Sequence, residues 1–338
     1  MSRGNKAVKL LAVGYIVGML AQKKLESKKN LPMIGKNNKC DIDNVLILGS
    51  GGVLGLAWHA ATLRRLERLG LWNPEEDDLR IGTSAGSMVA MALGAGLTPE
   101  KILKIVSGEL VPHNDSDLQM PKVPVNVQIG KGRSNRWYLL KAISKARFPY
   151  PGLFISSLFP HGEATMDELL DIVNRITDGN WPKTETWVTS AEINKGARHV
   201  FDRNSGITPG FAVAASCSIP SVYRPMQHIE DKQFVDGGVI SGLHIDLAIR
   251  LKPKKIIILA PLSGFVKLDF SDPWNVSVKK IARNGQELAI AMAKAKAKRN
   301  GTELIVLRPR PIENELLNRG SLMDSTLLPE LIEATLKD

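Results

Sequence analysis

The chain has 338 residues, of which 43% are apolar and 23% are charged, and it contains two cysteines. This apolar content excludes general disorder, because it can bury enough surface to offset the entropy of the chain. A disulfide scaffold is excluded as well, since Cys40 and Cys217 lie far apart in a large chain, which fits a reducing compartment. The formal net charge of +11 would suit a nucleic-acid-binding protein, so its distribution matters.

Most of the positive charge lies at the N-terminus. Residues 1–39 carry nine lysines and arginines and one glutamate, which leaves a net charge of only +3 for the other 299 residues. An uncharged run from Leu10 to Ala21 is flanked on both sides by basic residues. As a helix this run reaches about 18 Å, short of a hydrocarbon core of about 30 Å. We therefore expect residues 1–30 to meet a membrane surface as an anchor or interfacial helix, with the lysines on anionic headgroups.

Two alternatives to membrane attachment stay open for this apolar and basic helix. A cleaved signal peptide fits poorly, because the residues around Ala21 lack the small-residue pattern of a cleavage site. The other alternative is a helix that packs on its own domain. Residues 22–40 are polar and rich in lysine, so we predict that residues 1–40 form an anchor or tether and that residues 41–338 form the folded body.

The first elements of the folded body alternate between short apolar strands and helices. Strands are predicted over 45–48 and 79–81, each stopped by a glycine-rich loop. Helices are predicted over 56–69, then up to about Leu93, and then from Thr98 as the N-cap. This order predicts a parallel sheet with helices on its faces.

The second half of the chain continues without an internal repeat or a convincing domain boundary. Residues 165–168 fit a capping box before a helix, and strands are predicted over 187–191 and 197–201, joined by a turn. A strand over 233–235 leads into a D-G-G sequence, and two buried strands are predicted at 255–259 and 303–307. We predict one α/β domain with a mostly parallel central sheet and helices on both faces.

The sequence from Gly82 to Gly86 has the form G-x-S-x-G and lies between a predicted strand and a predicted helix. Its glycines permit a tight strand-to-helix turn that lifts a serine hydroxyl clear of the sheet. Ser84 is therefore a candidate nucleophile. The alternative is a glycine-rich helix N-cap without a chemical role.

A second glycine-rich loop covers residues 49–55 and ends the strand before the serine turn. Its small residues leave backbone N–H groups that can bind a developing oxyanion. A dinucleotide-binding loop is the competing interpretation, but its G-x-G-x-x-G pattern needs glycine where this chain has Leu54.

A carboxylate follows the strand at 233–235, in the sequence Asp236-Gly237-Gly238. This carboxylate could accept the proton of Ser84 and return it to a leaving group, provided that burial raises its pKa enough for it to act as a base. The alternative is an ordinary turn at the end of a strand.

Together the three segments resemble the patatin-like phospholipases, which are acyl hydrolases that use a Ser–Asp dyad. The resemblance spans about residues 44–260 and includes a stretch of small residues over 214–220, ahead of the D-G-G sequence. It implies that Ser84 is the nucleophile and that Asp236 is its base. It further implies that the amides around Gly51, Gly52 and Val53 form an oxyanion hole. The family's motif glycines would be Gly55, Gly82, Gly86, Gly237 and Gly238.

The resemblance implies chemistry without a metal or another cofactor. Acyl transfer would use an acyl-serine intermediate that water resolves, on carboxylic esters of phospholipids, lysophospholipids or related lipids. Two alternatives stay open, an acyl thioesterase or acyltransferase and a catalytically silent lipid-binding module. Residues 41–338 would be the catalytic domain, on the cytoplasmic side of a membrane that residues 1–30 contact.

The glycine-rich loop departs from the usual family pattern at two positions. Ser50 replaces the first of three glycines, and Leu54 replaces a basic residue. Serine at position 50 is a small change if the hydrogen-bond donors begin at Gly51. Leu54 removes a positive charge near the site, which affects phosphate contacts or the anchoring of the loop and leaves the dyad untouched.

Neither the histidines nor the other basic residues are needed for this chemistry. None of the six histidines has a position that matches a Ser–His–Asp order. A basic stretch over 279–299 lacks any recognition motif for nucleic acid, so no such partner is expected. The irregular, aromatic-rich segment 108–161 is either a cap over the acyl site that meets a membrane or ordinary core packing.

Overall fold

The structure is a computed structural model that describes residues 42–113, 116–120, 162–227, 232–264 and 275–337. The predicted anchor and tether over residues 1–40 lie outside these ranges, as does most of the aromatic-rich segment 108–161. Within the described residues, no helix is both long enough and apolar enough to cross a membrane.

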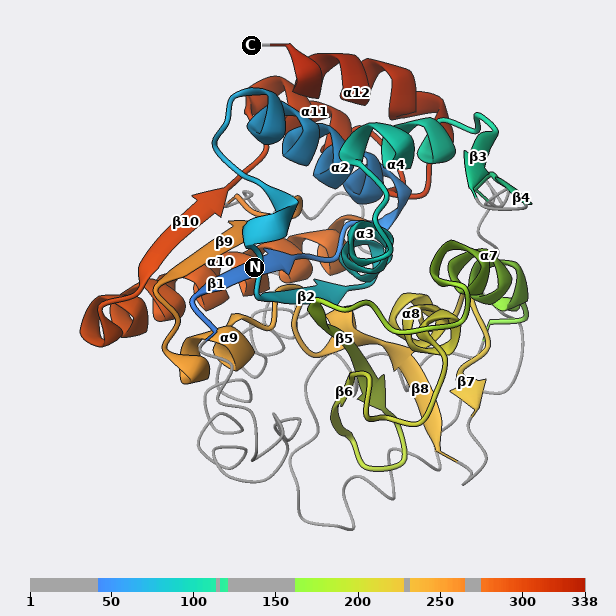
Figure 1. Cartoon of the computed structure of the whole chain (residues 1–338), viewed down its shortest axis with the longest axis horizontal. Helices are drawn as coiled ribbons and strands as arrows, with labels where there is room; N and C mark the ends of the chain where they lie inside the picture. The colour runs from blue at the N-terminus through green and yellow to red at the C-terminus, as the bar shows by residue number, and fades with distance from the viewer. Residues whose placement is uncertain (1–41, 114–115, 121–161, 228–231, 265–274, 338) are drawn as a thin grey trace, which may run out of the picture.

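An eight-stranded sheet lies at the centre of the described part of the chain (Figure 1). Its main body is parallel, in the order β10, β9, β1, β2, β5. These strands are β1 (Asn44–Leu48), β2 (Leu79–Thr83), β5 (Glu185–Glu192), β9 (Lys255–Leu259) and β10 (Glu303–Leu307). The remaining pairings are antiparallel: β6 (Ala197–Phe201) and β8 (Gln233–Asp236) both pair with β5, and β7 (Met226–Gln227) pairs with β8.

Helices cover both faces of this sheet, which confirms the predicted fold class. One face carries α2 (Gly52–Arg68), α3 (Ala85–Gly94), α4 (Pro99–Val106), α7 (Asp167–Thr177), α8 (Pro209–Cys217), α11 (Pro311–Asn318) and α12 (Leu328–Leu336). The other face carries α9 (Ile245–Leu251) and α10 (Asn275–Asn300). A short hairpin, β3 (Val111–His113) and β4 (Ser116–Leu118), lies apart from the main sheet.

Strand β1 shows why its sequence is apolar at successive positions. Successive side chains of a strand point to opposite faces of a sheet. Leu46 and Leu48 pack in the core beneath α2 and α3, whereas Val45 and Ile47 pack in the core beneath α9 and α10. Full burial of such a side chain contributes about 1.5–3 kcal/mol, so a strand covered on both faces needs apolar residues throughout.

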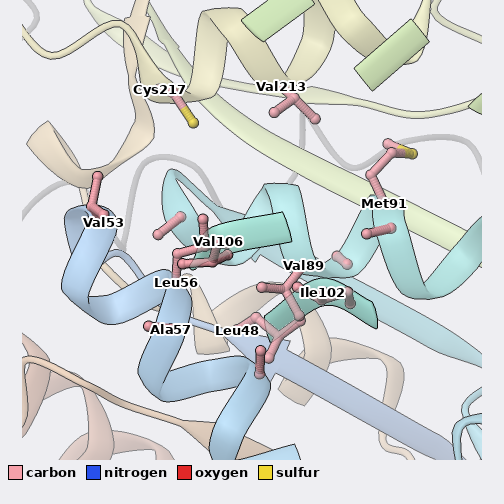
Figure 2. Close-up of a cluster of buried hydrophobic side chains, with 14 of the residues drawn as sticks. Leu48, Val53, Leu56, Ala57, Val89, Met91, Ile102, Val106, Val213 and Cys217 are labelled. Atoms are coloured by element: carbon pink, nitrogen blue, oxygen red, sulfur yellow. The ribbon is translucent and has the colours of Figure 1, made fainter. Parts of the chain in front are cut away.

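The core beneath α2 and α3 extends to the segment that surrounds the candidate site. Figure 2 shows Leu48, Val53 and Leu56 on one side of this cluster and Cys217 with Val213 of α8 on the other. The small-residue stretch at 214–220 therefore contributes to the core through α8, where its alanines are fully buried.

Three predictions about individual elements are wrong. Helix α2 begins at Gly52, inside the predicted loop, because the glycine-rich segment continues directly into the helix. The capping box does not form, since the N-cap of α7 is Met166 and no side chain caps it. Strand β10 is the sheet edge and is partly exposed, although its apolar sequence predicted a buried strand.

The other predicted strands and helices are confirmed within a few residues. The turn between β5 and β6 closes with a hydrogen bond from the Gly196 N–H to the carbonyl of Ile193 (3.0 Å). Thr98 caps α4 through its side chain, which accepts a hydrogen bond from the Lys101 N–H (3.3 Å).

Candidate active site

Ser84 lies in the sharp turn between β2 and α3, at the carboxyl edge of the sheet. Its φ angle of +52° and ψ of −124° place it in a region that non-glycine residues rarely adopt. Only 5% of its surface is exposed. The turn therefore holds Ser84 in a strained conformation above the end of β2, as the G-x-S-x-G spacing predicts.

The two glycines that flank this turn are required by close approaches of the backbone. A Cβ atom at Gly82 would lie 2.4 Å from the Cα atom of Ser87, and one at Gly86 would lie 2.1 Å from the carbonyl oxygen of Leu48. Both contacts are with main-chain atoms that the packed core holds in place. Glycine is thus the residue that allows α3 to begin directly over β1.

A chain of hydroxyl groups fixes the Ser84 backbone. The Ser84 N–H donates to Ser216 Oγ (2.8 Å), and Ser216 Oγ donates to the carbonyl of Thr189 (2.7 Å). Ser87 Oγ donates to the Ser84 carbonyl (2.6 Å). The sequence shows a stretch of small residues around position 216 but does not indicate this function of Ser216, because α8 contacts the serine turn only in the folded chain.

Asp236 reaches the same place from the antiparallel strand β8. Thr83, the residue before Ser84, is in register with Thr189 of β5, and the next residue of β5, Ser190, is in register with Asp236. Strand β5 thus extends beyond β2 and lets β8 return the carboxylate to the level of Ser84. At this level the Ser84 side chain is close enough to the Asp236 carboxylate to lower the pKa of that group.

The surroundings of Asp236 determine its charge state. Burial raises the pKa of its carboxyl group to about 6, although hydrogen bonds from Ser84 and from the Gly238 N–H oppose this shift. The Gly238 bond is short, at 2.6 Å to Oδ1. Burial and the nearby Asp236 carboxylate also raise the pKa of the Cys217 thiol, so this buried cysteine stays protonated. A carboxylate with a pKa near neutrality is suited to general-base catalysis.

The D-G-G glycines close the turn after the carboxylate. A Cβ atom at Gly237 would lie 2.5 Å from the carbonyl oxygen of Thr189, so no side chain fits there. Gly238 supplies the N–H that Asp236 accepts. The two glycines therefore allow the chain to turn tightly against β5 directly after the carboxylate.

Three consecutive amides of the glycine-rich loop have no hydrogen-bond partner in the part of the chain that the structure describes. The N–H groups on either side of these three form hydrogen bonds. The Ser50 N–H donates to the carbonyl of Gly242 (2.9 Å), and the Leu54 N–H donates to the carbonyl of Leu322 (3.0 Å). Among the described residues, no group accepts a hydrogen bond from the N–H of Gly51, Gly52 or Val53. These amides lie at the start of α2, where the helix dipole also favours negative charge.

Not every glycine of this loop is sterically required. Gly52 has a φ of +63° and Gly51 packs against Pro261 and Gly55, so side chains at either position would be strained or would clash. At Gly55, by contrast, a Cβ atom would make ordinary contact with the Pro261 side chain at 3.5 Å. The predicted motif glycine at 55 is therefore not required by packing.

An apolar cavity of about 230 Å³ opens beside Ser84. It is lined mainly by apolar side chains, including Leu56, Met88, Met166, Ile219 and Tyr223. Gly52 and Val53 of the glycine-rich loop lie at its wall. An apolar cavity that adjoins a hydroxyl group and free amides can hold an acyl chain with its carbonyl group at the polar end.

The histidines of the described residues do not reach the Ser84 hydroxyl. Burial lowers the pKa of His59 to about 4, and its Nε2–H donates to the carbonyl of Gly49 (2.7 Å). His244 contacts the carbonyl of Gly237. Among the described residues, no three histidine, cysteine, aspartate or glutamate side chains are arranged to hold a metal ion.

The structure thus brings all the predicted site residues to one edge of the sheet, although they come from three separate segments. A sequence model described as patatin-like phospholipase matches residues 46–249, which is more than half of the chain. The chain belongs to the patatin-like phospholipase family. The matched range includes the glycine-rich loop, the serine turn and Asp236.

Three solved structures are distantly similar to the chain. No curated protein sequence matches the chain. Among solved structures, VipD of Legionella pneumophila matches with a TM-score of 0.40 and 12% identity over 87% of this chain and 67% of that chain. Human GIVD cytosolic phospholipase A2, solved with methyl gamma-linolenyl fluorophosphonate, matches with a TM-score of 0.33 and 10% identity over 99% of this chain and 62% of that chain.

The type III effector ExoU of Pseudomonas aeruginosa is a further similar structure. It matches with a TM-score of 0.30 and 14% identity over 87% of this chain. This chain spans 53% of that ExoU chain and 62% of the human enzyme, less than two thirds of either. With TM-scores below 0.5, these similarities add nothing to the description of the site.

Proposed function

We propose that this chain is a serine acyl hydrolase that cleaves carboxylic esters of phospholipids or lysophospholipids with a Ser84–Asp236 dyad. Membership of the patatin-like phospholipase family supports the broader statement, a hydrolase that acts on lipids. The observation that carries the dyad is the register of β2, β5 and β8, which brings the buried Asp236 carboxylate to the level of Ser84. Burial there raises the pKa of Asp236 to about 6. The apolar cavity beside Ser84 supports a lipid substrate.

The reaction follows from these positions. Ser84 Oγ attacks the ester carbonyl carbon while Asp236 takes the hydroxyl proton, and the amides of Gly51, Gly52 and Val53 stabilise the oxyanion. The bond to the leaving alcohol then breaks, and Asp236 returns the proton to the alcohol oxygen. Water attacks the acyl-serine in the same way: Asp236 accepts a water proton and passes it to Ser84 Oγ as the acid leaves.

A fluorophosphonate probe tests the nucleophile directly. We expect the probe to phosphonylate the purified protein, and peptide mass mapping should place the adduct on Ser84. Labelling should disappear in Ser84→Ala and persist in Ser190→Ala, which removes a buried serine hydroxyl that donates to the carbonyls of Val235 (2.8 Å) and Ala215 (3.4 Å). A folded protein that takes up no label would instead support a catalytically silent lipid-binding module.

Product analysis tests the substrate class. We expect fatty acid to be released from phospholipid or lysophospholipid vesicles, because the cavity fits an acyl chain and the dyad can activate water. Triacylglycerol and an acyl thioester serve as comparison substrates. Faster turnover of the thioester, or transfer of the acyl group to an added alcohol, would favour the thioesterase or acyltransferase alternative.

The rate of ester hydrolysis should fall as the pH is lowered, with a midpoint near pH 6. The reason is that Asp236 accepts a proton only when it is ionised, and burial raises its pKa to about 6. The measurement is kcat/KM for a non-ionising ester as a function of pH, which reports the free enzyme. A rate that stays constant from about pH 8 to about pH 4.5 would contradict the proposed base.

We propose further that residues 1–30 attach the enzyme to anionic membranes. The support is the clustering of positive charge on both sides of the apolar run over 10–21. Replacing Lys23, Lys24, Lys28 and Lys29 with glutamine in the full chain should weaken sedimentation with vesicles that contain phosphatidylglycerol. Vesicles of phosphatidylcholine alone provide the control, and equal binding of both proteins to both vesicles would contradict the proposal.

A further inference from the structure

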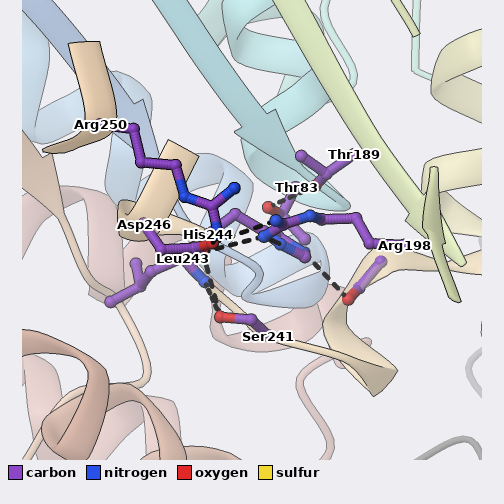
Figure 3. A network of polar contacts seen from close by, with 9 residues as sticks. Thr83, Thr189, Arg198, Ser241, Leu243, His244, Asp246 and Arg250 are labelled. Carbon is purple, nitrogen blue, oxygen red and sulfur yellow. Dashed lines mark hydrogen bonds and ion pairs between the residues drawn. The ribbon is translucent and has the colours of Figure 1, made fainter. Parts of the chain in front are cut away.

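A cluster of one buried histidine and three partly buried charged side chains lies next to the turn that follows Asp236, on the face of the sheet covered by α9. It consists of Arg198 from β6, and His244, Asp246 and Arg250 at the start of and within α9, and Figure 3 shows these side chains converging. His244 is fully buried and adopts a left-handed conformation, with a φ of +47°. None of these residues belongs to the motifs of the serine, the oxyanion hole or the base.

The hydrogen bonds of His244 determine its tautomer. Its Nδ1 atom lies 3.2 Å from Arg198 Nη1, and its Nε2 atom lies 3.2 Å from the carbonyl oxygen of Gly237. A guanidinium group can only donate and a carbonyl can only accept. Nδ1 is therefore the acceptor and Nε2 carries the proton, so the ring of His244 donates to the peptide group between Gly237 and Gly238.

The charges around the ring keep it in this state. Arg198 forms a two-point ion pair with Asp246, with distances of 2.9 and 3.0 Å, and Arg250 lies 3.6 Å from the same carboxylate. Arg198 donates to Nδ1, so the ring cannot take up its second proton at this nitrogen without breaking that hydrogen bond. Burial and Arg198 together lower the pKa of His244 to about 3, so the ring stays neutral across the pH range of catalysis.

The Gly237 carbonyl is the point at which this cluster meets the site. Gly237 lies between Asp236 and Gly238, and the Gly238 N–H is the donor that holds Asp236 Oδ1 at 2.6 Å. The peptide group whose carbonyl His244 holds is therefore the one whose N–H binds the Asp236 carboxylate. A displacement of about 1 Å in a catalytic group can lower a rate about 100-fold, so anchoring of this turn matters for catalysis.

We propose that His244 is a positioning residue for Asp236, held in its neutral Nε2–H form by the Arg198–Asp246 ion pair. This inference rests on the proposed function, because it requires Asp236 to act as the base. His244 itself does not contact the acyl group. It fixes the carbonyl of Gly237, and through that peptide group it sets the direction of the carboxylate toward Ser84.

Three variants of the full chain test the proposal with a chromogenic p-nitrophenyl ester. His244→Leu removes both ring hydrogen bonds, and we expect kcat to fall about 10- to 100-fold with little change in KM. His244→Gln keeps a side-chain N–H donor and should restore most of kcat. His199→Leu is the matched control: His199 neighbours Arg198 on β6 but lies on the opposite face, against Phe201 and Phe234, and its removal should leave kcat unchanged.

The pH profile separates positioning from a general structural effect. Loosening the turn weakens the Gly238 bond, which stabilises ionised Asp236, so the pKa of Asp236 should rise and the acid limb of His244→Leu should move to higher pH. Equal kcat and an unchanged acid limb in wild type and His244→Leu would overturn the positioning role. An inactive and unlabelled wild type would instead overturn the proposed function.

A measurement on the wild type keeps the proposal falsifiable if His244→Leu does not fold. Nitrogen-15 NMR of histidine-labelled protein distinguishes the two neutral tautomers and the charged ring. We expect the His244 signals of a neutral Nε2–H imidazole that does not titrate between about pH 5 and pH 8. An Nδ1–H tautomer or a ring that becomes charged in this range would overturn the assignment.

Discussion

Replacing Asp236 with asparagine is expected to lower kcat by about 10³- to 10⁴-fold while it makes the protein more stable. The amide can still occupy the site and accept the hydrogen bond from the Gly238 N–H, but it cannot take up the proton of Ser84. Ester hydrolysis by purified wild type and variant measures the loss. A variant that keeps more than about one tenth of the wild-type kcat would exclude Asp236 as the base.

The gain in stability follows from the raised pKa of Asp236. The unfolded chain releases this proton near pH 3.8, whereas the folded chain holds it up to about pH 6. Between these values the folded state binds more protons, so ionisation of Asp236 lowers the free energy of unfolding as the pH rises. Removing the ionisable group should raise that free energy at pH 7.5 by at most about 3 kcal/mol, and the difference should vanish below about pH 4.

Asp246→Asn is the matched control, because this partly buried carboxylate should affect stability in the opposite direction. Arg198 lowers the pKa of Asp246 to about 2, so this carboxylate stabilises the fold at neutral pH and its contribution is lost only as the pH falls toward 2. The variant leaves Arg198 buried without its two-point partner. Urea unfolding at pH 7.5 should show a loss of about 1.5 to 3 kcal/mol for Asp246→Asn and a gain for Asp236→Asn.

Substitution of Gly86 by alanine should disrupt the fold at the site, with a loss of more than about 4 kcal/mol in the free energy of unfolding. The added methyl group would lie 2.1 Å from the carbonyl oxygen of Leu48 and 2.4 Å from its carbonyl carbon. Both atoms belong to the buried end of β1, so relief requires α3 to move away from the sheet. Chemical denaturation and fluorophosphonate labelling of the remaining folded protein measure the effect.

Gly55→Ala provides the contrasting substitution within the same set of motif glycines. Its methyl group would meet the Pro261 side chain at 3.5 and 3.7 Å, which is ordinary contact, and Gly55 lies inside α2. Alanine in a helix interior is favoured over glycine by about 0.5–1 kcal/mol, so this variant should unfold at equal or higher urea concentration. Similar losses in Gly55→Ala and Gly86→Ala would contradict the packing described for the turn.

The sequence predicts the local elements because their signals are local. Apolar runs that end in glycine mark β1 and β2, and their spacing from apolar helices predicts a parallel sheet. The same reasoning fails for β10, whose apolar residues predicted burial, because position at a sheet edge depends on the order of strands in space. This reasoning also placed the start of α2 too late. Glycines usually end a helix or strand, whereas the glycines of this loop lead directly into a helix.

The chemistry-bearing residues of the site were determined by the sequence itself. The patterns around Ser84 and Asp236 and the glycine-rich loop identified the candidate nucleophile, base and oxyanion amides, and the structure brings them to one edge of the sheet. Only the tertiary structure determines the properties of these groups. Three of these properties depend on residues from separate elements. They are the burial that raises the pKa of Asp236, the hydrogen bond from the Ser84 N–H to Ser216, and the contact of His244 with Gly237. Spacing along a chain records which groups are present, whereas desolvation and hydrogen bonding depend on which groups meet in space.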